Sequence, residues 1–416
     1  MWTVDVEIVV GIVFGVAAVI LCIGTASVLA RTRFPLPPDG KRVGCIDGLR
    51  GYLALSVLIH HFVLWTLATR HHRPWGATDL NLVHELGSGA VGVFFMITGL
   101  LFYPTIRRGL FTGNWLQLYV RRAFRIVPMV AVSVVLVTAV IMVRTGRLPD
   151  GRYGLDALKW ISTKQEVDLL GYPDSGRINA YVLWSLRLEW LFYLFVIPIC
   201  ATAMQFRGRL PTWAIPVGLM AFGFVLHALD ARLTLPGFLP LFAAGMLACE
   251  LQERAWVRDL LRTPAATVLA LASLVAGMVL FPTPYDAALP LFAFFFVCVA
   301  AGNSLFGFLA LRPSLVLGEC SYGIYLTHAI FLSILFVDAA PLLNQVPTVA
   351  LPVLLPIVAV VVVLTTAATY LLVERPAIAM GVESGKRAML LEARLSGRKA
   401  PAFGLAEKPG QAPTGT

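Results

Sequence analysis

The chain has 416 residues, of which 58% are hydrophobic and only 13% are charged, and its formal net charge is +10. Soluble proteins carry about 25% charged residues, so this composition excludes a water-soluble globular fold. The basic residues sit in short loops between apolar runs, which is typical of charges that set membrane topology and argues against nucleic-acid binding. We therefore expect an all-α, polytopic transmembrane helix bundle, because lipid offers no partners to an open backbone.

Eleven apolar runs approach the length of about 20 residues that a bilayer crossing needs, which predicts about 10–11 transmembrane helices. Loops on the side of Arg31 carry more than twice as many Lys and Arg residues as the opposite loops. This bias predicts a multi-pass protein of the plasma membrane with a cytoplasmic C-terminus. The expected runs begin near Glu7, Ile46, Leu82, Ile126, Tyr181, Thr212, Leu235, Thr263, Ala287, Ser314 and Thr348.

The chain divides into three expected regions. Residues 1–45 form an additional N-terminal transmembrane helix and a cytoplasmic linker, residues 46–376 form the main membrane domain, and residues 377–416 form a disordered cytoplasmic tail. The long loop Arg144–Ile178 is expected either to cover the outer mouth of the bundle or to be a solvated connector. The six cysteines show no CxxC spacing, so we expect small buried side chains and no metal site.

The first polar site is the stretch DGLRGYLALSVLIHH, from Asp47 to His61. On a helix, eleven residues place Arg50 and His61 on one face, about 16 Å apart along the axis, while His60 points elsewhere. Polar groups at this depth are costly and mark functional sites by default. The structural alternatives are an arginine that reaches the headgroups and a neutral, buried histidine.

The second site is Glu189 in WSLRLEWLFY, which lies near the middle of its run. Arg187 is on another face of that helix, so the partner of Glu189 is expected from a different helix, and His61 or Arg50 would serve. The structural alternative is an interhelical hydrogen bond without a catalytic role.

The third site is GECSYGIYLTH, in which Tyr325 and His328 are neighbours on a helix surface. Together with the hydroxyl of Ser321 they predict a hydrophilic cavity for a hydroxylated substrate, whereas Tyr322 is expected to pack. The fourth site is the pair Arg122 and Arg125, which face the same way and suit phosphate groups.

Simpler interpretations exist near the fourth site. Arginines are expected at this place from the positive-inside bias alone, and Arg121 is expected to point away from the pair. The glycine-rich run Gly87–Phe102 is expected to serve close helix packing rather than ligand binding.

Taken together, the four sites resemble acyltransferase family 3, integral membrane proteins that transfer acyl groups, commonly acetyl, to cell-envelope sugars and secreted metabolites. The family pattern of an arginine, ten residues and a histidine matches Arg50 and His61. The resemblance covers roughly residues 46–376. The other matching motifs are Phe94–Gly99, Arg122 and Arg125, Trp184–Tyr193, Ser321–His328 and the ERP sequence at Glu374–Pro376, which is expected to end the last helix.

The resemblance implies an O-acyltransferase that uses acetyl-CoA as acyl donor. His61 is then expected to be the base or a transient acyl carrier, oriented by Glu189, with Arg50 at a donor phosphate or the oxyanion. Arg122 and Arg125 would hold the phosphates of acetyl-CoA. The residues expected to bind the acceptor are Tyr325, His328 and Ser321.

Several departures and alternatives accompany this resemblance. Trp190 replaces the second glutamate of the family motif, Thr98 replaces a serine, Glu319 stands where a basic or polar residue is usual, and the first run is additional. The acceptor is a cell-envelope glycan or a secreted metabolite, and a separate extracytoplasmic transferase either completes the transfer or is not needed. A proton-coupled transporter and a sensory or scaffold protein are the competing classes, although no inverted repeat is visible.

Overall fold

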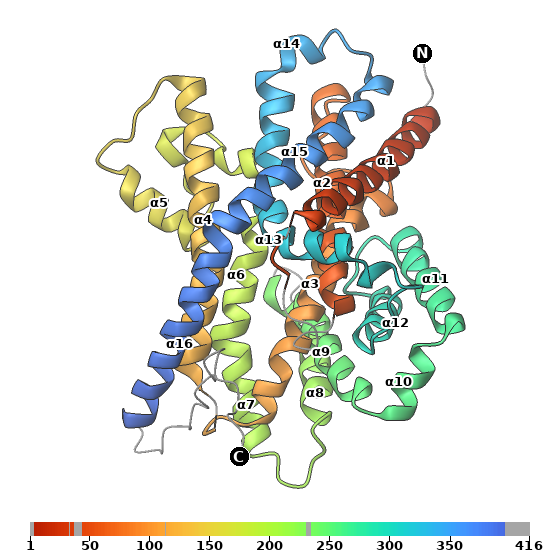
Figure 1. The fold of residues 1–416 in the computed structure, drawn as a ribbon, viewed down its shortest axis with the longest axis vertical. Helices are drawn as coiled ribbons and strands as arrows, with labels where there is room; N and C mark the ends of the chain where they lie inside the picture. The colour runs from red at the N-terminus through yellow and green to blue at the C-terminus, as the bar shows by residue number, and fades with distance from the viewer. Residues whose placement is uncertain (1–3, 33, 37–43, 113, 230–233, 396–416) are drawn as a thin grey trace, which may run out of the picture.

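The computed structural model describes residues 4–32, 34–36, 44–112, 114–229 and 234–395, and these are helical with no strand (Figure 1). The expected all-α helix bundle is therefore confirmed. The long and short α-helices are α1 (Val4–Arg31), α2 (Gly44–Arg70), α3 (Asn81–Arg107), α4 (Trp115–Thr145), α5 (Tyr153–Ile161), α6 (Leu183–Leu191), α7 (Ile197–Gln205), α8 (Ala214–Leu229), α9 (Thr234–Gln252), α10 (Ala255–Leu261), α11 (Pro264–Leu280), α12 (Leu289–Ala300), α13 (Arg312–Ser333), α14 (Ala340–Leu343), α15 (Leu354–Thr369) and α16 (Arg375–Leu395).

Seven short turns of other helical types complete the described chain. Three of them are π-helical turns that continue an α-helix without a break: η3 continues α6, η5 continues α13, and η7 continues α15. The turns are η1 (Leu169–Gly171), η2 (Ser175–Asn179), η3 (Phe192–Val196), η4 (Phe308–Ala310), η5 (Ile334–Asp338), η6 (Thr348–Val353) and η7 (Tyr370–Glu374).

Eight helical segments of the described chain are long and apolar enough to cross a membrane, and the bent pair of α10 and α11 makes a ninth. The runs expected near Thr212 and Ala287 form the shorter helices α8 and α12, of 16 and 12 residues. At about 1.5 Å per residue, α12 by itself is shorter than a bilayer core. All eleven expected runs are thus helical, but fewer than eleven are full crossings.

The most extensive helix contact joins α2 and α13, which lie side by side at the centre of the bundle (Figure 1). A Cβ atom on Gly318 would lie 1.9 Å from the backbone oxygen of Asp47, and one on Gly51 would lie 2.6 Å from Cβ of Leu317. Only glycine permits this separation, because any larger side chain would overlap the facing backbone. The two helices therefore meet backbone against backbone.

The glycine-rich run on α3 serves the same purpose against α9. A Cβ atom on Gly99 would lie 2.0 Å from the carbonyl oxygen of Phe242, and one on Gly245 would lie 1.9 Å from that of Met96. The expectation of close helix packing is thus confirmed at Gly99.

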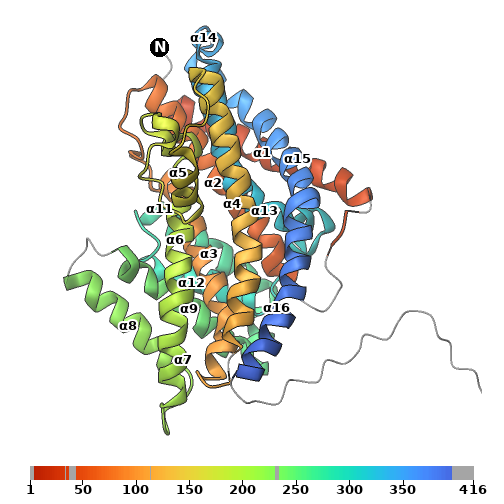
Figure 2. The same cartoon turned by 90° about the vertical axis from the view of Figure 1, so that its left-hand side faces the viewer.

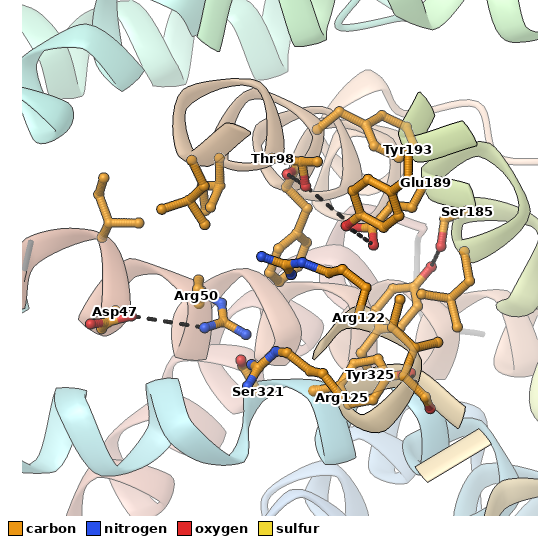
Figure 3. A pocket seen from close by; sticks show the side chains of 18 of the residues that line it. Asp47, Arg50, Thr98, Arg122, Arg125, Ser185, Glu189, Tyr193, Ser321 and Tyr325 are labelled. Carbon is orange, nitrogen blue, oxygen red and sulfur yellow. Dashed lines mark hydrogen bonds and ion pairs between the residues drawn. The ribbon is translucent and has the colours of Figure 1, made fainter. Parts of the chain in front are cut away.

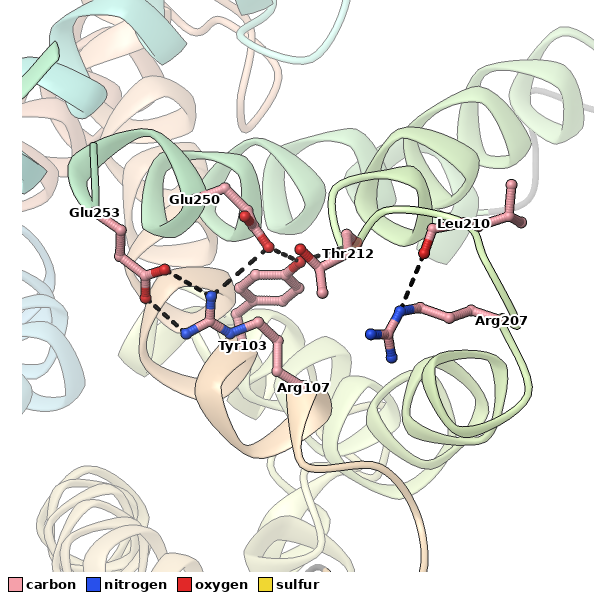
Figure 4. A network of polar contacts seen from close by, with 7 residues as sticks. All are labelled: Tyr103, Arg107, Arg207, Leu210, Thr212, Glu250 and Glu253. Atoms are coloured by element: carbon pink, nitrogen blue, oxygen red, sulfur yellow. Dashed lines mark hydrogen bonds and ion pairs between the residues drawn. The ribbon is translucent and has the colours of Figure 1, made fainter. Parts of the chain in front are cut away.

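A polar network fastens α3 to α9 at the end of the bundle that carries α7 (Figure 4). Arg107 donates two hydrogen bonds to the carboxylate of Glu253, at 2.6 and 2.7 Å. The hydroxyl of Tyr103 donates to Glu250 at 2.6 Å and contacts the backbone oxygen of Thr212 at 3.0 Å. At the opposite end, near α14, Arg144 at the end of α4 donates to Asp338 at 2.7 Å.

The helix α16 packs along α4 over much of its length (Figure 2). Cβ atoms on Gly381 and Gly385 would lie 2.6 Å from Phe124 and 3.0 Å from the side chain of Arg121. The expected disorder is therefore wrong for residues 377–395, and the ERP sequence does not end the helix. Gly381 and Gly385, four residues apart, allow this polar segment to pack closely against α4. The composition of the segment does not reveal such a contact. Residues 396–416 lie outside the described residues.

The additional helix α1 lies against α15 and α13 (Figure 1). Its residues Ala18, Cys22 and Ala26 are buried in this contact, while Val16 and Ile20 on other faces are more than half exposed. All six cysteines are buried and free, as expected from their spacing.

Replacing Gly318 by alanine is expected to destabilise the protein by about 1–3 kcal/mol, because the new methyl group overlaps the backbone of α2. Thermal unfolding of the purified protein in detergent measures the change. Gly24→Ala on α1 is the control, because nothing lies within 4 Å of its Cβ position. Equal unfolding temperatures for the two variants would contradict the close contact.

Candidate functional site

A cavity of about 750 Å³ lies among α2, α3, α4, α6, α13 and α16. Its size suits a cofactor-sized ligand. Most sequence-predicted polar residues meet here, although they come from four distant parts of the chain. The polar residues that line it are Asp47, Arg50, Thr98, Arg121, Arg122, Arg125, Ser185, Glu189, Tyr193, Ser321, Tyr322 and Tyr325.

The charged lining of the cavity is predominantly positive. It contains four arginines and two carboxylates, those of Asp47 and Glu189. Figure 3 shows the guanidinium groups of Arg50, Arg122 and Arg125 pointing into the same space. Like charges gathered in a partly enclosed space repel one another, so the cavity favours an anionic ligand.

The arginines of α4 differ in their partners. Arg125 lies 3.7 Å from the carboxylate of Glu374, which is 1% exposed, so this guanidinium already balances a buried charge. Arg122 instead lies over the rings of Phe102 and Tyr193, at 4.3 and 5.6 Å. Among the described residues it forms no ion pair and no hydrogen bond. Arg122 is therefore the guanidinium best placed to bind a ligand.

The third arginine of α4 was expected to point away and does not. Arg121 also lines the cavity, and its side chain runs beside Gly385 of α16. Arg121 reaches the cavity because α16 forms one of its walls, through Ile378 and Val382.

Glu189 is held by hydroxyl groups. Tyr193 donates to its carboxylate at 2.9 Å, and Thr98 of α3 donates at 3.4 Å. The positive charges of Arg122 and Arg50, which lie further away, favour the ionised form of this carboxylate. The expected partner on another helix is thus Thr98, and the expected contact with His61 is wrong for the described geometry. Tyr193 reaches back because it is four residues further along the same helical segment.

The histidines form a separate pair. His61 of α2 and His328 of α13 are joined by a contact of 3.0 Å between Nδ1 of His61 and Nε2 of His328. Both lie ten residues beyond the glycine contact of their helices, at Gly51 and Gly318. Because the number of residues from the glycine to the histidine is the same in both helices, α2 and α13 run in the same direction. This brings the two imidazoles together.

The hydrogen bonds define the tautomers when both rings are neutral. Nδ1 of His328 lies 2.9 Å from the carbonyl oxygen of Ile324, which can only accept, so this nitrogen carries the proton. Nε2 of His328 must then accept, and the proton between the rings belongs to Nδ1 of His61. Nε2 of His61 is consequently left unprotonated, as a base or nucleophile requires. His60 instead bonds Val83 of α3 through its own Nδ1.

The histidine pair lies next to a residue that lines the cavity. Among the described residues that line the cavity, neither His61 nor His328 appears. Tyr325 and Ser185 do line it, their hydroxyls are hydrogen bonded at 2.7 Å, and the ring of Tyr325 is 6.4 Å from the ring of His328. Tyr325 therefore adjoins both the positive cavity and the histidine pair.

A family model described as an acyltransferase domain matches residues 43–373. The chain belongs to acyltransferase family 3. No curated protein and no solved structure matches the chain. The molecule is therefore a multi-pass membrane acyltransferase, and the resemblance inferred from the motifs is confirmed.

The expected site of this acyltransferase is assembled only in part. Arg50, Arg122, Arg125 and Glu189 share one cavity, while His61 and His328 form the pair beyond it. The expected acceptor-binding groups also separate. Tyr325 and Ser321 line the cavity, and so does Tyr322, whose hydroxyl bonds the backbone of Ile126 and which was expected only to pack.

Some side chains of the site were not predicted. Glu374 was noted only as part of a motif, and its burial against Arg125 depends on α16 folding along α4. Trp75 stacks on His61, with ring centroids 6.4 Å apart and planes at 19°. The residues Gly381 and Gly385 were the available signal for the α16 contact, whereas nothing in the sequence identifies Trp75.

His61 is expected to carry its proton on Nδ1 when neutral. In nitrogen NMR spectra of the protein labelled in its histidine rings, Nε2 of His61 should show the shift of an unprotonated ring nitrogen. The variant His61→Gln assigns the signal, and His227→Gln on α8 is the matched control. A protonated Nε2 in the neutral ring would contradict the hydrogen-bond assignment.

Proposed function

We propose that this acyltransferase moves an acyl group, in the first instance acetyl, from acyl-CoA to a hydroxyl of a cell-envelope glycan. The observation that carries the proposal is the positive cavity whose lining residue Tyr325 adjoins a histidine pair, in which Nε2 of His61 is unprotonated when both rings are neutral. A polyphosphate donor matches the cavity, and a hydroxyl acceptor matches the base.

The phosphates of acyl-CoA would bind at Arg122 and Arg121. Both line the cavity on α4, at the side that the positive-inside bias assigns to the cytoplasm together with the C-terminus. Arg125 would position this wall through Glu374 and add charge at longer range. This orientation in the plasma membrane is part of the proposal.

Arg50 would act on the donor phosphates rather than on the oxyanion. It lies eleven residues before His61 on the same helix, which is about 16 Å along the axis. One thioester carbonyl cannot contact both groups. The earlier alternative of an oxyanion role for Arg50 is therefore set aside in favour of phosphate binding, where its weak pairing to Asp47 at 3.8 Å leaves it available.

The acyl end of the donor would extend past Tyr325 and Ser185 to reach His61. There Nε2 of His61 would take the proton of the acceptor hydroxyl while the hydroxyl oxygen bonds the acyl carbon. The carbon–sulfur bond then breaks, and the proton passes from the imidazolium to the departing thiolate. In the covalent variant Nε2 first bonds the acyl carbon and the carbon–sulfur bond breaks, which releases the CoA thiolate. The acceptor hydroxyl then attacks the acyl carbon, the bond to Nε2 breaks, and the hydroxyl proton passes to the thiolate.

The remaining polar groups would support these steps. His328 orients His61 through the bond to Nδ1, which is the role first assigned to Glu189. Glu189 would balance the charge of Arg122 and keep it in the cavity. Tyr325 and Ser321 would contact the acyl arm. A purified protein that completes the transfer would need no separate extracytoplasmic transferase.

Replacing His61 by alanine is expected to lower CoA release from acetyl-CoA by at least about 100-fold, because the base is lost. The release is measured with a thiol reagent on protein purified in detergent. His60→Gln is the control, since His60 points to α3, and it should keep most of the activity. Near-normal turnover of His61→Ala would remove His61 from the mechanism.

Replacing Arg122 by alanine is expected to weaken acetyl-CoA binding by about tenfold or more, the value of a lost charge-assisted hydrogen bond. Acetyl-pantetheine, which lacks the phosphates, should bind the variant and the wild type equally. Arg254→Ala at the start of α10 is the matched control. An equal loss for both ligands would show that Arg122 does not bind the phosphates.

A further inference from the structure

The segment between α5 and α6 folds over the end of α2 that lies beyond His61. Its turn η2 packs against α13 and α4. From this turn, the guanidinium of Arg177 lies over two indole rings, 4.9 Å from that of Trp75 and 5.4 Å from that of Trp65. Of the two interpretations of the long loop, a cover over this end of the bundle is the one that these contacts support.

Unsatisfied hydrogen-bond donors gather at this place. Nε of Arg177, Nε1 of Trp65 and Nδ2 of Asn179 are all buried without a hydrogen-bond partner among the described residues. Asn179 uses only its oxygen, which accepts from Gln165. Buried donors are nearly always satisfied in folded proteins, so the donors of Arg177 and Trp65, which lie together, point to acceptor atoms that a ligand brings.

Arg177 also has a positive charge that no described carboxylate neutralises. The nearby Asp174 accepts the hydroxyl proton of Tyr181 instead, and Arg187 takes the exposed carboxylate of Glu166. A guanidinium held on aromatic rings and left without an anion is a ready partner for a carboxylate or a phosphate.

The backbone around the turn is strained. Asp174, Ala180 and Tyr181 have φ angles of 58°, 54° and 56°, a region that residues other than glycine rarely adopt. Such strain collects where a structure holds a side chain in a required place, at active sites and ligand clamps. Here it holds η2, and with it Arg177, against the tryptophans.

The patch adjoins the proposed base. Trp75 stacks on His61, with ring centroids 6.4 Å apart, and the guanidinium of Arg177 lies 4.9 Å from the same indole ring. His61, Trp75 and Arg177 are all partly exposed, so a ligand can reach the guanidinium and the indole face. A molecule that places an anion at Arg177 would therefore have the indole of Trp75 as its link to the imidazole of His61.

We infer that Arg177, Trp75 and Trp65 form the acceptor subsite, and that the acceptor is a sugar carrying a carboxylate or a phosphate close to the hydroxyl that is acylated. The inference rests on the proposed function. The anion would bind Arg177, the sugar oxygens would accept from the neighbouring donors, and the sugar ring would contact the exposed part of Trp75. Arg177 would then determine acceptor specificity without touching the acyl donor.

The test is a titration of the full-length protein in detergent with three probes, D-glucuronate, D-glucose 6-phosphate and D-glucose, followed by tryptophan fluorescence. At least one charged sugar is expected to bind the wild type about tenfold or more tightly than D-glucose. The tighter of the two charged probes identifies the anion. Arg177→Gln should abolish the preference, while Arg187→Gln on α6, the matched control, should keep it.

The second variant, Arg177→Lys, keeps the charge but loses the planar fork. This variant is expected to keep binding D-glucose 6-phosphate and to lose the preference for D-glucuronate over D-glucose. If Arg177→Gln does not fold, Arg177→Lys alone provides the test. Equal binding of charged and neutral sugars to the wild type, no binding of any probe, or an unchanged preference in the Arg177 variants would each overturn the subsite.

These titrations contain no acyl-CoA, so they are independent of transfer. His61-dependent release of CoA without a preference for charged sugars would leave the proposed function standing and remove the subsite. A charged-sugar preference without any thioester cleavage would do the reverse.

Discussion

The contact between α2 and α13 is the constraint on which the rest of the molecule depends. Gly51 and Gly318 let the two backbones meet, and the shared direction of the helices carries this alignment ten residues onward to His61 and His328. Because a helix is stiff over this length, the glycine contact determines the distance between the imidazoles. The same contact brings Arg50 and Ser321 together in the lining of the cavity (Figure 3).

Buried charge is the second organising force. A charged side chain at this depth costs several kcal/mol unless it is paired or hydrogen bonded. The molecule meets this cost for Glu374 with Arg125 and for Glu189 with two hydroxyls. Glu189 lies shortly before the π-helical turn η3, which carries its partner Tyr193, and Glu374 ends the π-helical turn η7. Such turns rotate the following residues relative to a regular helix and often accompany functional sites.

Under the proposed function, the cavity and the histidine pair perform separate tasks. The cavity gathers positive charge without full compensation, whereas the hydrogen bonds of the pair leave one nitrogen free when both rings are neutral. Tyr325 adjoins both of them. A division of this kind lets one element bind a highly charged donor while another, in apolar surroundings, keeps its basic nitrogen for chemistry.

The sequence by itself determined the membrane class and the eleven apolar helical runs, because these depend on local hydropathy, helical periodicity and motif spacing. It also singled out Arg50, Glu189, Arg122 and Arg125, which the fold brings to one cavity. Only the tertiary structure decided which groups meet. His61 pairs with His328 instead of Glu189, Arg121 joins the cavity, and residues 377–395 form a helix along α4. The reason is physical: a helical face is a local property, but a partner across helices depends on the crossing of backbones far apart in the chain.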